Sequence, residues 1–370
     1  MEKYFITGGT GVIGCALIPH LLRLKDVELV LLVRAENPVH LQERLEKVFK
    51  FCKISVNDER RSRVHGVIGN ASLPGFGIEC DAFKDILSTT THIIHAAGNV
   101  RMNLSIEDAR TCSLNSAKNV IALAERSMET GKLKKIEFVS TVGVGGRMSG
   151  VLPEEWITVK REYHNTYEQA KAEAEDYIKK YADKGFPVTV HRPSMVVGDS
   201  KTGEIIHYQV FYHLVEFLSG RRTLGVTPST GSTKIDIIPS DYVAQAIVWS
   251  SQTDNTIGKI MHECSGDKDA LAISTLRKRL PDIYRQNGTE VPNATIISLW
   301  VFKSILPVIG WFVSKKARRA MKALPVFFSY IAENISFDNS KTRLLLRDEL
   351  EIPSIDHYLG TILNHYLANR

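Results

Sequence analysis

Tyr167 and Lys171 stand four residues apart in Tyr167-Glu168-Gln169-Ala170-Lys171, inside a segment whose pattern predicts a helix. At that spacing the phenol and the ammonium lie on one face of the helix. A nearby ammonium stabilises a phenolate and lowers the tyrosine pKa, so we expect Tyr167 to exchange a proton with a carbonyl oxygen near neutral pH. Most Tyr-x-x-x-Lys pairs are structural, so the neighbouring motifs must show whether this pair is catalytic.

Ser140 and Thr141 end a run, Ile136–Ser140, that predicts a strand. A hydroxyl at this point could hold the same substrate oxygen, and we assign that role to Thr141. Ser and Thr at strand ends are also common turn formers, which is the structural alternative.

A glycine-rich turn, Gly8-x-x-Gly11-x-x-Gly14, lies between a predicted strand and a predicted helix. Gly8 permits the tight turn, Gly11 lets backbone N–H groups approach a pyrophosphate, and Gly14 lets helix and strand pack closely. The turn therefore predicts a dinucleotide site. Its expected contacts are Thr7, Gly8, Thr10, Gly11, Val12, Ile13 and Gly14.

The end of the second predicted strand indicates which dinucleotide is bound. It reads Val33-Arg34-Ala35, with no acidic residue before Glu36. An NAD site usually places Asp or Glu here for the ribose hydroxyl, whereas a guanidinium suits a 2′-phosphate. We therefore predict NADP(H). Arg44, on the next predicted helix, either adds a second phosphate contact or lies on a solvated face.

Short apolar runs alternate with amphipathic segments over the first 200 residues, which predicts a doubly wound parallel α/β sheet of the Rossmann type. The predicted strands are Tyr4–Thr7, Glu28–Val33, Val64–Ile68, Thr91–His95, Lys135–Ser140 and Val188–His191, and the predicted helices are Val12–Arg23, Pro38–Lys50, Ala82–Leu87, Ile106–Thr130 and Thr166–Lys184.

The alternation weakens after Pro193, and a further strand, Lys234–Ile238, ends at Pro239. We therefore expect an NADP-binding Rossmann domain and a smaller, mostly helical C-terminal substrate lobe. The predicted Rossmann domain is 1–198 with 236–264 returning to it, and the predicted lobe is 199–235 and 265–370.

Taken in order, the glycine loop, the strand-end hydroxyl and Tyr-x-x-x-Lys resemble the extended short-chain dehydrogenase/reductase superfamily, over about residues 1–265. The resemblance implies that Lys171 binds the nicotinamide ribose and that a helix asparagine, Asn115, helps to position this lysine. It also extends the cofactor site to Ala96, Ala97, Gly98, Pro193, Met195 and Val196.

The segments Leu32–Ala35 and Arg192–Gly203 are more similar to the branch of thioester reductases and fatty acyl-CoA reductases. Asn70 and Ala172 depart from the pattern of that branch. The resemblance implies NADPH-dependent hydride transfer to an acyl thioester, on CoA or an acyl or peptidyl carrier protein. The product would be an aldehyde, or an alcohol after a second transfer.

Two other functions compete with this interpretation. One is an extended short-chain epimerase, dehydratase or hydroxyl dehydrogenase acting on a sugar nucleotide or other alcohol or ketone. Arg34 and the run Ser200-Lys201-Thr202-Gly203 speak against it. The other is a non-catalytic NADP-sensing regulator, which would have no reason to keep Thr141, Tyr167 and Lys171 together.

The apolar stretch Thr295–Val313 is long enough to span a bilayer, but Lys303 and Pro307 near its middle argue against that. A helical hairpin that walls an acyl-chain pocket is our first interpretation. An interfacial helix, with peripheral membrane contact through 295–319, comes second.

Composition limits the remaining choices. A net charge of +6 over 370 residues does not predict nucleic-acid binding, and 44% hydrophobic with 24% charged residues is typical of a folded protein. The five cysteines show no C-x-x-C pair, so we expect neither disulfides nor a metal site. With no visible signal peptide, we expect a cytoplasmic protein, membrane-associated only if 295–319 binds lipid.

Overall fold

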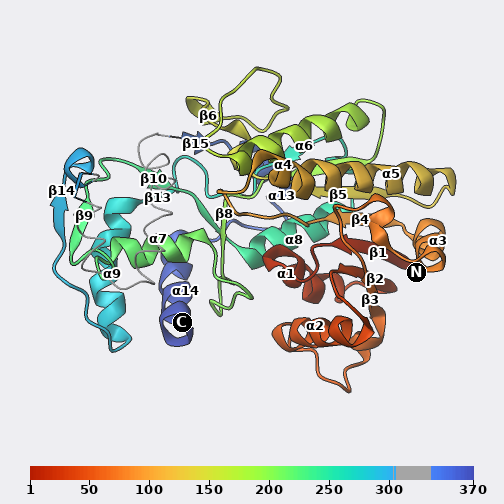
Figure 1. The fold of residues 1–370 in the computed structure, drawn as a ribbon, viewed down its shortest axis with the longest axis horizontal. Helices are drawn as coiled ribbons and strands as arrows, with labels where there is room; N and C mark the ends of the chain where they lie inside the picture. The colour runs from red at the N-terminus through yellow and green to blue at the C-terminus, as the bar shows by residue number, and fades with distance from the viewer. Residues whose placement is uncertain (303, 306–334) are drawn as a thin grey trace.

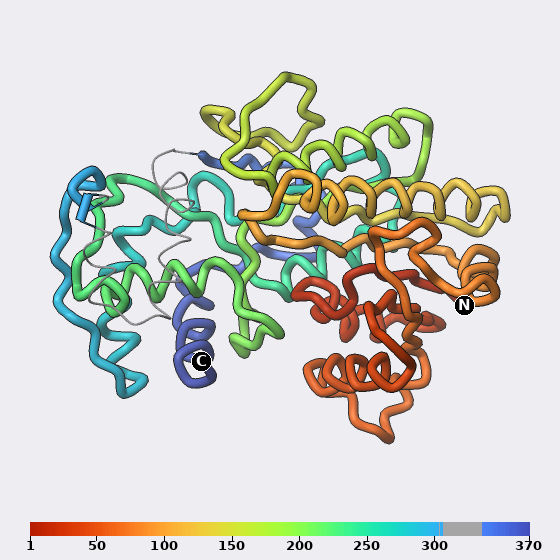
Figure 2. The backbone as a smooth tube through the Cα atoms, viewed as in Figure 1, coloured from red at the N-terminus to blue at the C-terminus, as the bar shows by residue number. Residues whose placement is uncertain are grey.

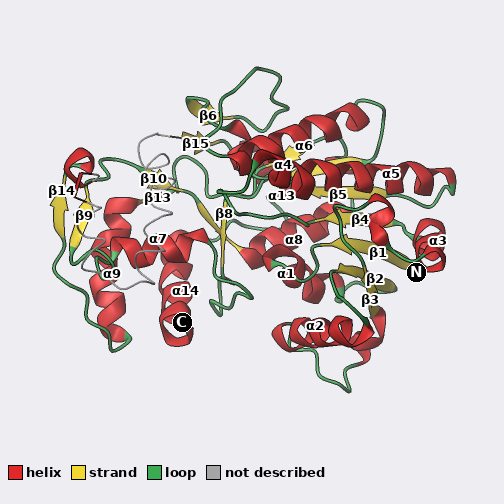
Figure 3. Cartoon of the chain, viewed as in Figure 1, coloured by secondary structure: helices red, strands yellow, loops and turns green. Residues whose placement is uncertain are grey.

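The computed structural model describes residues 1–302, 304–305 and 335–370. Its main sheet has seven parallel strands in the order β12-β7-β5-β4-β1-β2-β3 (Figures 1 and 3). The strand order reverses between β1 and β4, where a doubly wound sheet opens its ligand crevice. The strands are β1 (Glu2–Thr7), β2 (Val27–Val33), β3 (Val64–Ile68), β4 (His92–His95), β5 (Lys135–Val139), β7 (Val188–His191) and β12 (Ile260–Met261).

Helices cover both faces of this sheet, so its strands are buried on both sides (Figure 1). In β2, Leu29 and Leu31 belong to one apolar cluster, while Val30 and Leu32 belong to the other. This explains why the strand reads as a continuous apolar run, and the predicted Rossmann fold is confirmed. The first cluster includes α1 (Val12–Leu21), α2 (Pro38–Phe51) and α8 (Ser240–Ser251), and the second includes α3 (Cys80–Thr89), α5 (Ser116–Glu129) and α6 (Thr166–Ala182).

A second group of elements forms a lobe beside the carboxyl ends of the strands. Its apolar cluster joins α7 (Val210–Leu218), α9 (Ile273–Gln286) and α14 (Ile355–Asn369). The N-terminus lies at the sheet and the C-terminus lies in the lobe, at the end of α14 (Figure 2). Outside the main sheet, short strands form four pairs: β8 (Met195–Val197) with β11 (Ile237–Pro239), β9 (Val226–Pro228) with β14 (Thr295–Ile297), β10 (Lys234–Ile235) with β13 (Leu271–Ala272), and β6 (Gly150–Leu152) with β15 (Ile335–Phe337).

Two predicted elements are divided in the structure. The predicted helix Ile106–Thr130 consists of α4 (Ile106–Arg110), a π-helical turn at Thr111–Asn115, and α5. The predicted strand Lys234–Ile238 is interrupted at Asp236, because its two halves pair with different strands, β13 and β8.

Two segments that the sequence assigned to the lobe contact the Rossmann part of the chain. Leu346 of α13 (Ser340–Leu346) packs in the Rossmann cluster, and β15 pairs with β6. The predicted helical hairpin is wrong at its start, because Thr295–Ile297 is strand β14. The later part of that segment, including the basic cluster up to residue 319, lies outside the described residues.

In the part of the chain that the structure describes, none of the helices is both long and apolar enough to cross a bilayer.

Candidate active site

A cavity of about 730 Å³ lies at the carboxyl ends of the sheet strands. It brings together residues that the sequence placed far apart, from the glycine loop, from β5 and from α6. All but three of the predicted site residues line it. Those that do are Gly8, Thr10, Gly11, Val12, Ile13, Arg34, Arg44, Ala96, Ala97, Gly98, Thr141, Tyr167, Lys171, Pro193, Met195 and Val196.

The glycine loop is shaped to admit a dinucleotide. Gly8 has φ +77°, and a Cβ on it would stand 2.5 Å from the Ala96 carbonyl, so no other residue fits. A Cβ on Gly14 would stand 2.2 Å from the Gly8 oxygen, so α1 can pack against the loop only with glycine there. No side chain caps the N-terminus of α1, whose amides border the cavity at Val12 and Ile13. These features fit a pyrophosphate.

Thr7 and Gly14 do not line the cavity and support the loop from behind. The Thr7 hydroxyl lies 2.7 Å from Nδ1 of His95, whose other ring nitrogen lies 3.3 Å from the Ser116 hydroxyl. Burial lowers the pKa of His95 to about 3, so this ring is neutral. The loop is therefore tied to β4 and α5 by an uncharged network.

Arg44 bonds to the protein instead of lying on a solvated face. Its guanidinium donates to the Arg34 carbonyl at 2.6 Å and to the Thr10 hydroxyl at 3.0 Å. Arg44 therefore fastens the end of β2 to the glycine loop. The exposed Arg34 side chain lies beside it on the cavity wall, so two cations stand where a ribose 2′-substituent would lie.

Thr141 and Tyr167 both line the cavity, and the Thr141 side chain is near enough to affect the pKa of Tyr167. Thr141 follows β5, and its hydroxyl accepts from the Gly143 amide at 3.1 Å. Tyr167 lies in the first turn of α6, whose N-terminus is capped by Asn165. Burial raises the pKa of Tyr167 to about 12, although the Thr141 side chain opposes this rise. The phenol is thus protonated at neutral pH.

Lys171 is almost fully buried, one turn beyond Tyr167. Its ammonium donates to the Val139 carbonyl at 2.7 Å and lies 5.1 Å from the centre of the Phe138 ring. Burial lowers its pKa to about 8, and Glu175 opposes that shift. The expectation that Lys171 lowers the Tyr167 pKa is not met, because loss of hydration dominates at the phenol and the ammonium is held by Val139.

Asn115 is placed differently from the prediction. Its side chain is exposed and does not line the cavity, whereas Cys112 of the same π-helical turn does. The structure therefore does not support a role for Asn115 beside Lys171. The π turn inserts a residue into the helical repeat and changes which side chains face inward.

Several cavity residues were missed by the sequence interpretation. Glu168 follows Tyr167 and lines the same wall. Asp236, between β10 and β11, accepts hydrogen bonds from the Ser265 and Gly266 amides at 2.8 Å each. Burial raises the pKa of Asp236 to about 6. The other missed residues come from a turn and from lobe elements that the sequence interpretation did not define, and they include Asn70, Gln209, Val210, Leu214, Ile273, Ile335 and Phe337.

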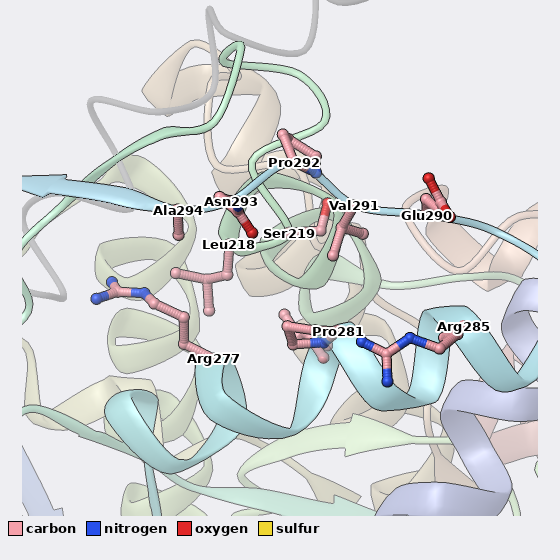
Figure 4. A pocket seen from close by; sticks show the side chains of 11 residues that line it. Leu218, Ser219, Arg277, Pro281, Arg285, Glu290, Val291, Pro292, Asn293 and Ala294 are labelled. Carbon is pink, nitrogen blue, oxygen red and sulfur yellow. The ribbon is translucent and has the colours of Figure 1, made fainter.

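A second pocket, about 210 Å³, lies in the lobe between α9 and an extended segment (Figure 4). Arg277 and Arg285 project from α9 along one side, while Pro292 and Asn293 close the other. Its lining contains none of the predicted catalytic or cofactor residues. The larger cavity is therefore the candidate active site.

A family model described as "Male sterility protein", an NAD-binding family, matches residues 6–247. The chain belongs to this family. The match includes the glycine loop, Thr141, Tyr167 and Lys171, and it confirms the predicted resemblance and a nicotinamide dinucleotide as cofactor.

Individual relatives agree with this membership. The chain is 30% identical to fatty acyl-CoA reductase wat of Drosophila melanogaster, over 52% of this chain and 42% of that protein. It is 26% identical to isonitrile lipopeptide synthase of Streptomyces coeruleorubidus, over 67% of this chain and 16% of that protein. The chain thus spans less than half the length of these relatives.

Among solved structures, the terminal R domain of the myxalamid PKS-NRPS pathway has the same fold. The TM-score is 0.80 at 23% identity, covering 100% of this chain and 90% of that chain. The likeness thus includes the lobe, which lies largely outside the family match.

Proposed function

We propose that this chain is an NADPH-dependent reductase that converts an acyl thioester to an aldehyde. The opening of Thr141, Tyr167, Lys171 and the glycine loop into one cavity carries the proposal. Two hydroxyl donors at a buried site are suited to a carbonyl oxygen on which negative charge develops. The names of the relatives, a fatty acyl-CoA reductase and a lipopeptide synthase, support a thioester as the carbonyl compound.

NADPH is favoured over NADH by the cations at the end of β2. Arg44 is held by two hydrogen bonds, and this leaves the exposed Arg34 to face the cavity. A guanidinium binds a phosphate with charge-assisted hydrogen bonds that a ribose hydroxyl cannot replace.

Bound NADPH would supply the hydride that the thioester carbonyl carbon takes up. Thr141 and Tyr167 would donate hydrogen bonds to the carbonyl oxygen and stabilise its negative charge. Because the pKa of Tyr167 is about 12, this residue holds its proton until that oxygen becomes basic enough to take it. Lys171, protonated below about pH 8, would bind the hydroxyls of the nicotinamide ribose and so hold the cofactor in place.

The resulting hemithioacetal breaks down in the same site. Its hydroxyl proton returns to Tyr167, the C–S bond breaks, and the thiolate leaves and takes a proton from water. The products are an aldehyde and a free thiol, and Tyr167 regains its starting form.

The thiol would be that of CoA or of a carrier-protein arm. A cytoplasmic setting suits this chemistry, and the five cysteines, all free, are compatible with a reducing compartment.

A substrate panel tests the proposal. NADPH oxidation is followed by absorbance with acyl-CoA thioesters, a thioester on a carrier protein, free aldehydes and sugar nucleotides. We expect NADPH oxidation with at least one thioester. Consumption of one NADPH per thioester indicates an aldehyde product, and consumption of two indicates an alcohol. Oxidation with aldehydes or sugar nucleotides but with no thioester would contradict the proposal.

A further inference from the structure

A buried carboxylate lies directly behind the catalytic lysine. Glu175 follows Lys171 by four residues on α6 and Tyr167 by eight, so the three share one face of the helix. Its side chain is only about 1% exposed. Burial of a carboxylate costs free energy unless the group is paired and hydrogen-bonded, so Glu175 requires partners that offset its desolvation.

Glu175 has two such partners on neighbouring strands. The Ser140 hydroxyl donates to Oε2 of Glu175 at 2.6 Å, and Nε of Arg192 donates to the same oxygen at 3.1 Å. A second guanidinium nitrogen of Arg192 pairs with Oε1. This geometry is bidentate, which fixes the orientation of the carboxylate as well as its position.

Arg192 is itself fully buried and anchored on its other side. It donates to the Glu155 carbonyl at 3.0 Å and lies 3.2 Å from Nε2 of His262. Burial lowers the pKa of His262 to about 3, so this ring adds no positive charge to Arg192. The ion pair with Glu175 is thus one buried, enclosed unit.

Each member of this unit adjoins a residue of the active site. Ser140 is followed by Thr141, which lines the cavity together with Tyr167. Arg192 is followed by Pro193, which lines the cavity. Glu175 lies one turn from Lys171, so three separate chain segments are fixed to one carboxylate.

The carboxylate also acts on Lys171 through its charge. Burial lowers the pKa of Lys171, and Glu175 is the charged group that raises it. Two other titratable groups near Lys171 are uncharged near neutral pH, since His95 on β4 is neutral above about pH 3 and Tyr167 keeps its proton up to about pH 12. Without Glu175, Lys171 would therefore lose its proton at a lower pH.

We propose that Glu175 is a positioning residue of the active site, which holds Ser140 and Arg192 in place and sets a negative charge one helical turn from Lys171. The inference rests on the proposed reductase activity for its kinetic test, but not for its binding test. Burial, two hydrogen-bond partners and the one-turn spacing from Lys171 carry it.

The kinetic test compares Glu175→Gln with the wild type over a range of pH. We expect the pH at which kcat/KM declines to fall by about one unit, because an opposite charge near a buried group shifts its pKa by about that much. Activity should drop about tenfold at pH 9 but less than about threefold at pH 6, where Lys171 is still protonated. General damage to the fold would lower activity equally at both pH values.

Two further variants keep the test decisive if Glu175→Gln folds poorly because it leaves Arg192 unpaired. Glu175→Asp retains the charge, so its kcat/KM should decline at the same pH as in the wild type. The double variant Glu175→Leu with Arg192→Met removes both charges, so its kcat/KM should decline at the lower pH expected for Glu175→Gln. Glu173→Gln is the matched control, since Glu173 lies on the same helix, pairs with Arg110 and should leave the profile unchanged.

The binding test is independent of the substrate. NADPH affinity is measured by fluorescence as a function of pH in the wild type and in each variant. As the pH rises, NADPH affinity should weaken at a pH about one unit lower in Glu175→Gln than in the wild type and in Glu173→Gln. An unchanged pH dependence of NADPH affinity in folded Glu175→Gln would overturn the inference, even if no thioester is reduced. A binding shift without thioester reduction would leave the inference standing and contradict only the proposed function.

Discussion

The two sides of the active-site cavity are built differently. On the Rossmann side, Thr141, Tyr167 and Lys171 project from the end of β5 and from the long helix α6, beside a sheet of seven strands. On the lobe side, the walls come from α7 and from β10 and β15, which are strands of two and three residues. Rigid elements fix the reacting groups closely, while short connections adapt to the substrate. We therefore expect rate to depend on the first side and substrate choice on the second.

The largest effect is expected at Tyr167. Tyr167→Phe removes the proton donor while keeping the ring, so kcat should fall by about a thousandfold or more. NADPH affinity should change little, because the glycine loop and Arg34 are untouched. Stopped-flow kinetics and fluorescence titration measure the two quantities, and a variant with near-normal kcat would remove Tyr167 from the mechanism.

Thr141→Ala should reduce kcat by about a hundredfold, as expected for the loss of one donor to a developing oxyanion. Thr141→Ser keeps the hydroxyl and is the matched control. Steady-state kinetics distinguish them. If the alanine and serine variants are equally active, the hydroxyl is only a turn former.

Arg34→Ala should weaken NADPH binding by about 10- to 100-fold, the equivalent of one lost charge-assisted contact. NADH, which lacks the 2′-phosphate, serves as the control and should bind the variant and the wild type alike. An equal loss for both cofactors would show that Arg34 shapes the loop instead of binding phosphate.

The wild-type pH profile tests the electrostatics of the same side. Burial lowers the pKa of Lys171 to about 8, so the required ammonium is present below that pH and is lost above it. We expect kcat/KM to fall about tenfold for each pH unit above about 8. The protein should remain folded there by circular dichroism. A flat profile up to about pH 10, the ordinary range of a lysine pKa, would show that the charge of Lys171 is not needed.

The smallest effect on rate is expected on the lobe side. Val210 begins α7 and lines the cavity. Val210→Ala should change the ratio of kcat/KM between long and short acyl thioesters by about tenfold, the size of a contact with one or two methylenes. Its kcat should stay within about threefold of wild type. A large loss of kcat with unchanged selectivity would reverse the contrast between the two sides.

The same contrast explains what could be predicted from the sequence. Val27–Val33 and the Tyr167–Lys171 pair are local patterns, and both have their predicted structure. The sequence did not predict where Asn115 lies, because the π turn at Thr111–Asn115 changes which side chains of the helix face the cavity. No local sequence pattern indicates that turn. The bonds from Ser140 and Arg192 to Glu175 were missed because they span 35 and 17 residues of chain.

The lobe was predicted least well, for a related reason. The pairing of Thr295–Ile297 with Val226–Pro228 joins segments about 70 residues apart. Such short strands have no period of their own, and their structure depends on partners that a sequence pattern does not identify.

One measurement tests the central claim most directly. The protein is mixed with NADPH and an acyl thioester, and NADPH loss, free thiol and aldehyde are followed together. We predict that one thiol appears for the first NADPH consumed, together with aldehyde, and that Tyr167→Phe gives none of the three. NADPH loss without thiol release in the wild type would show that the thioester carbonyl is not the hydride acceptor.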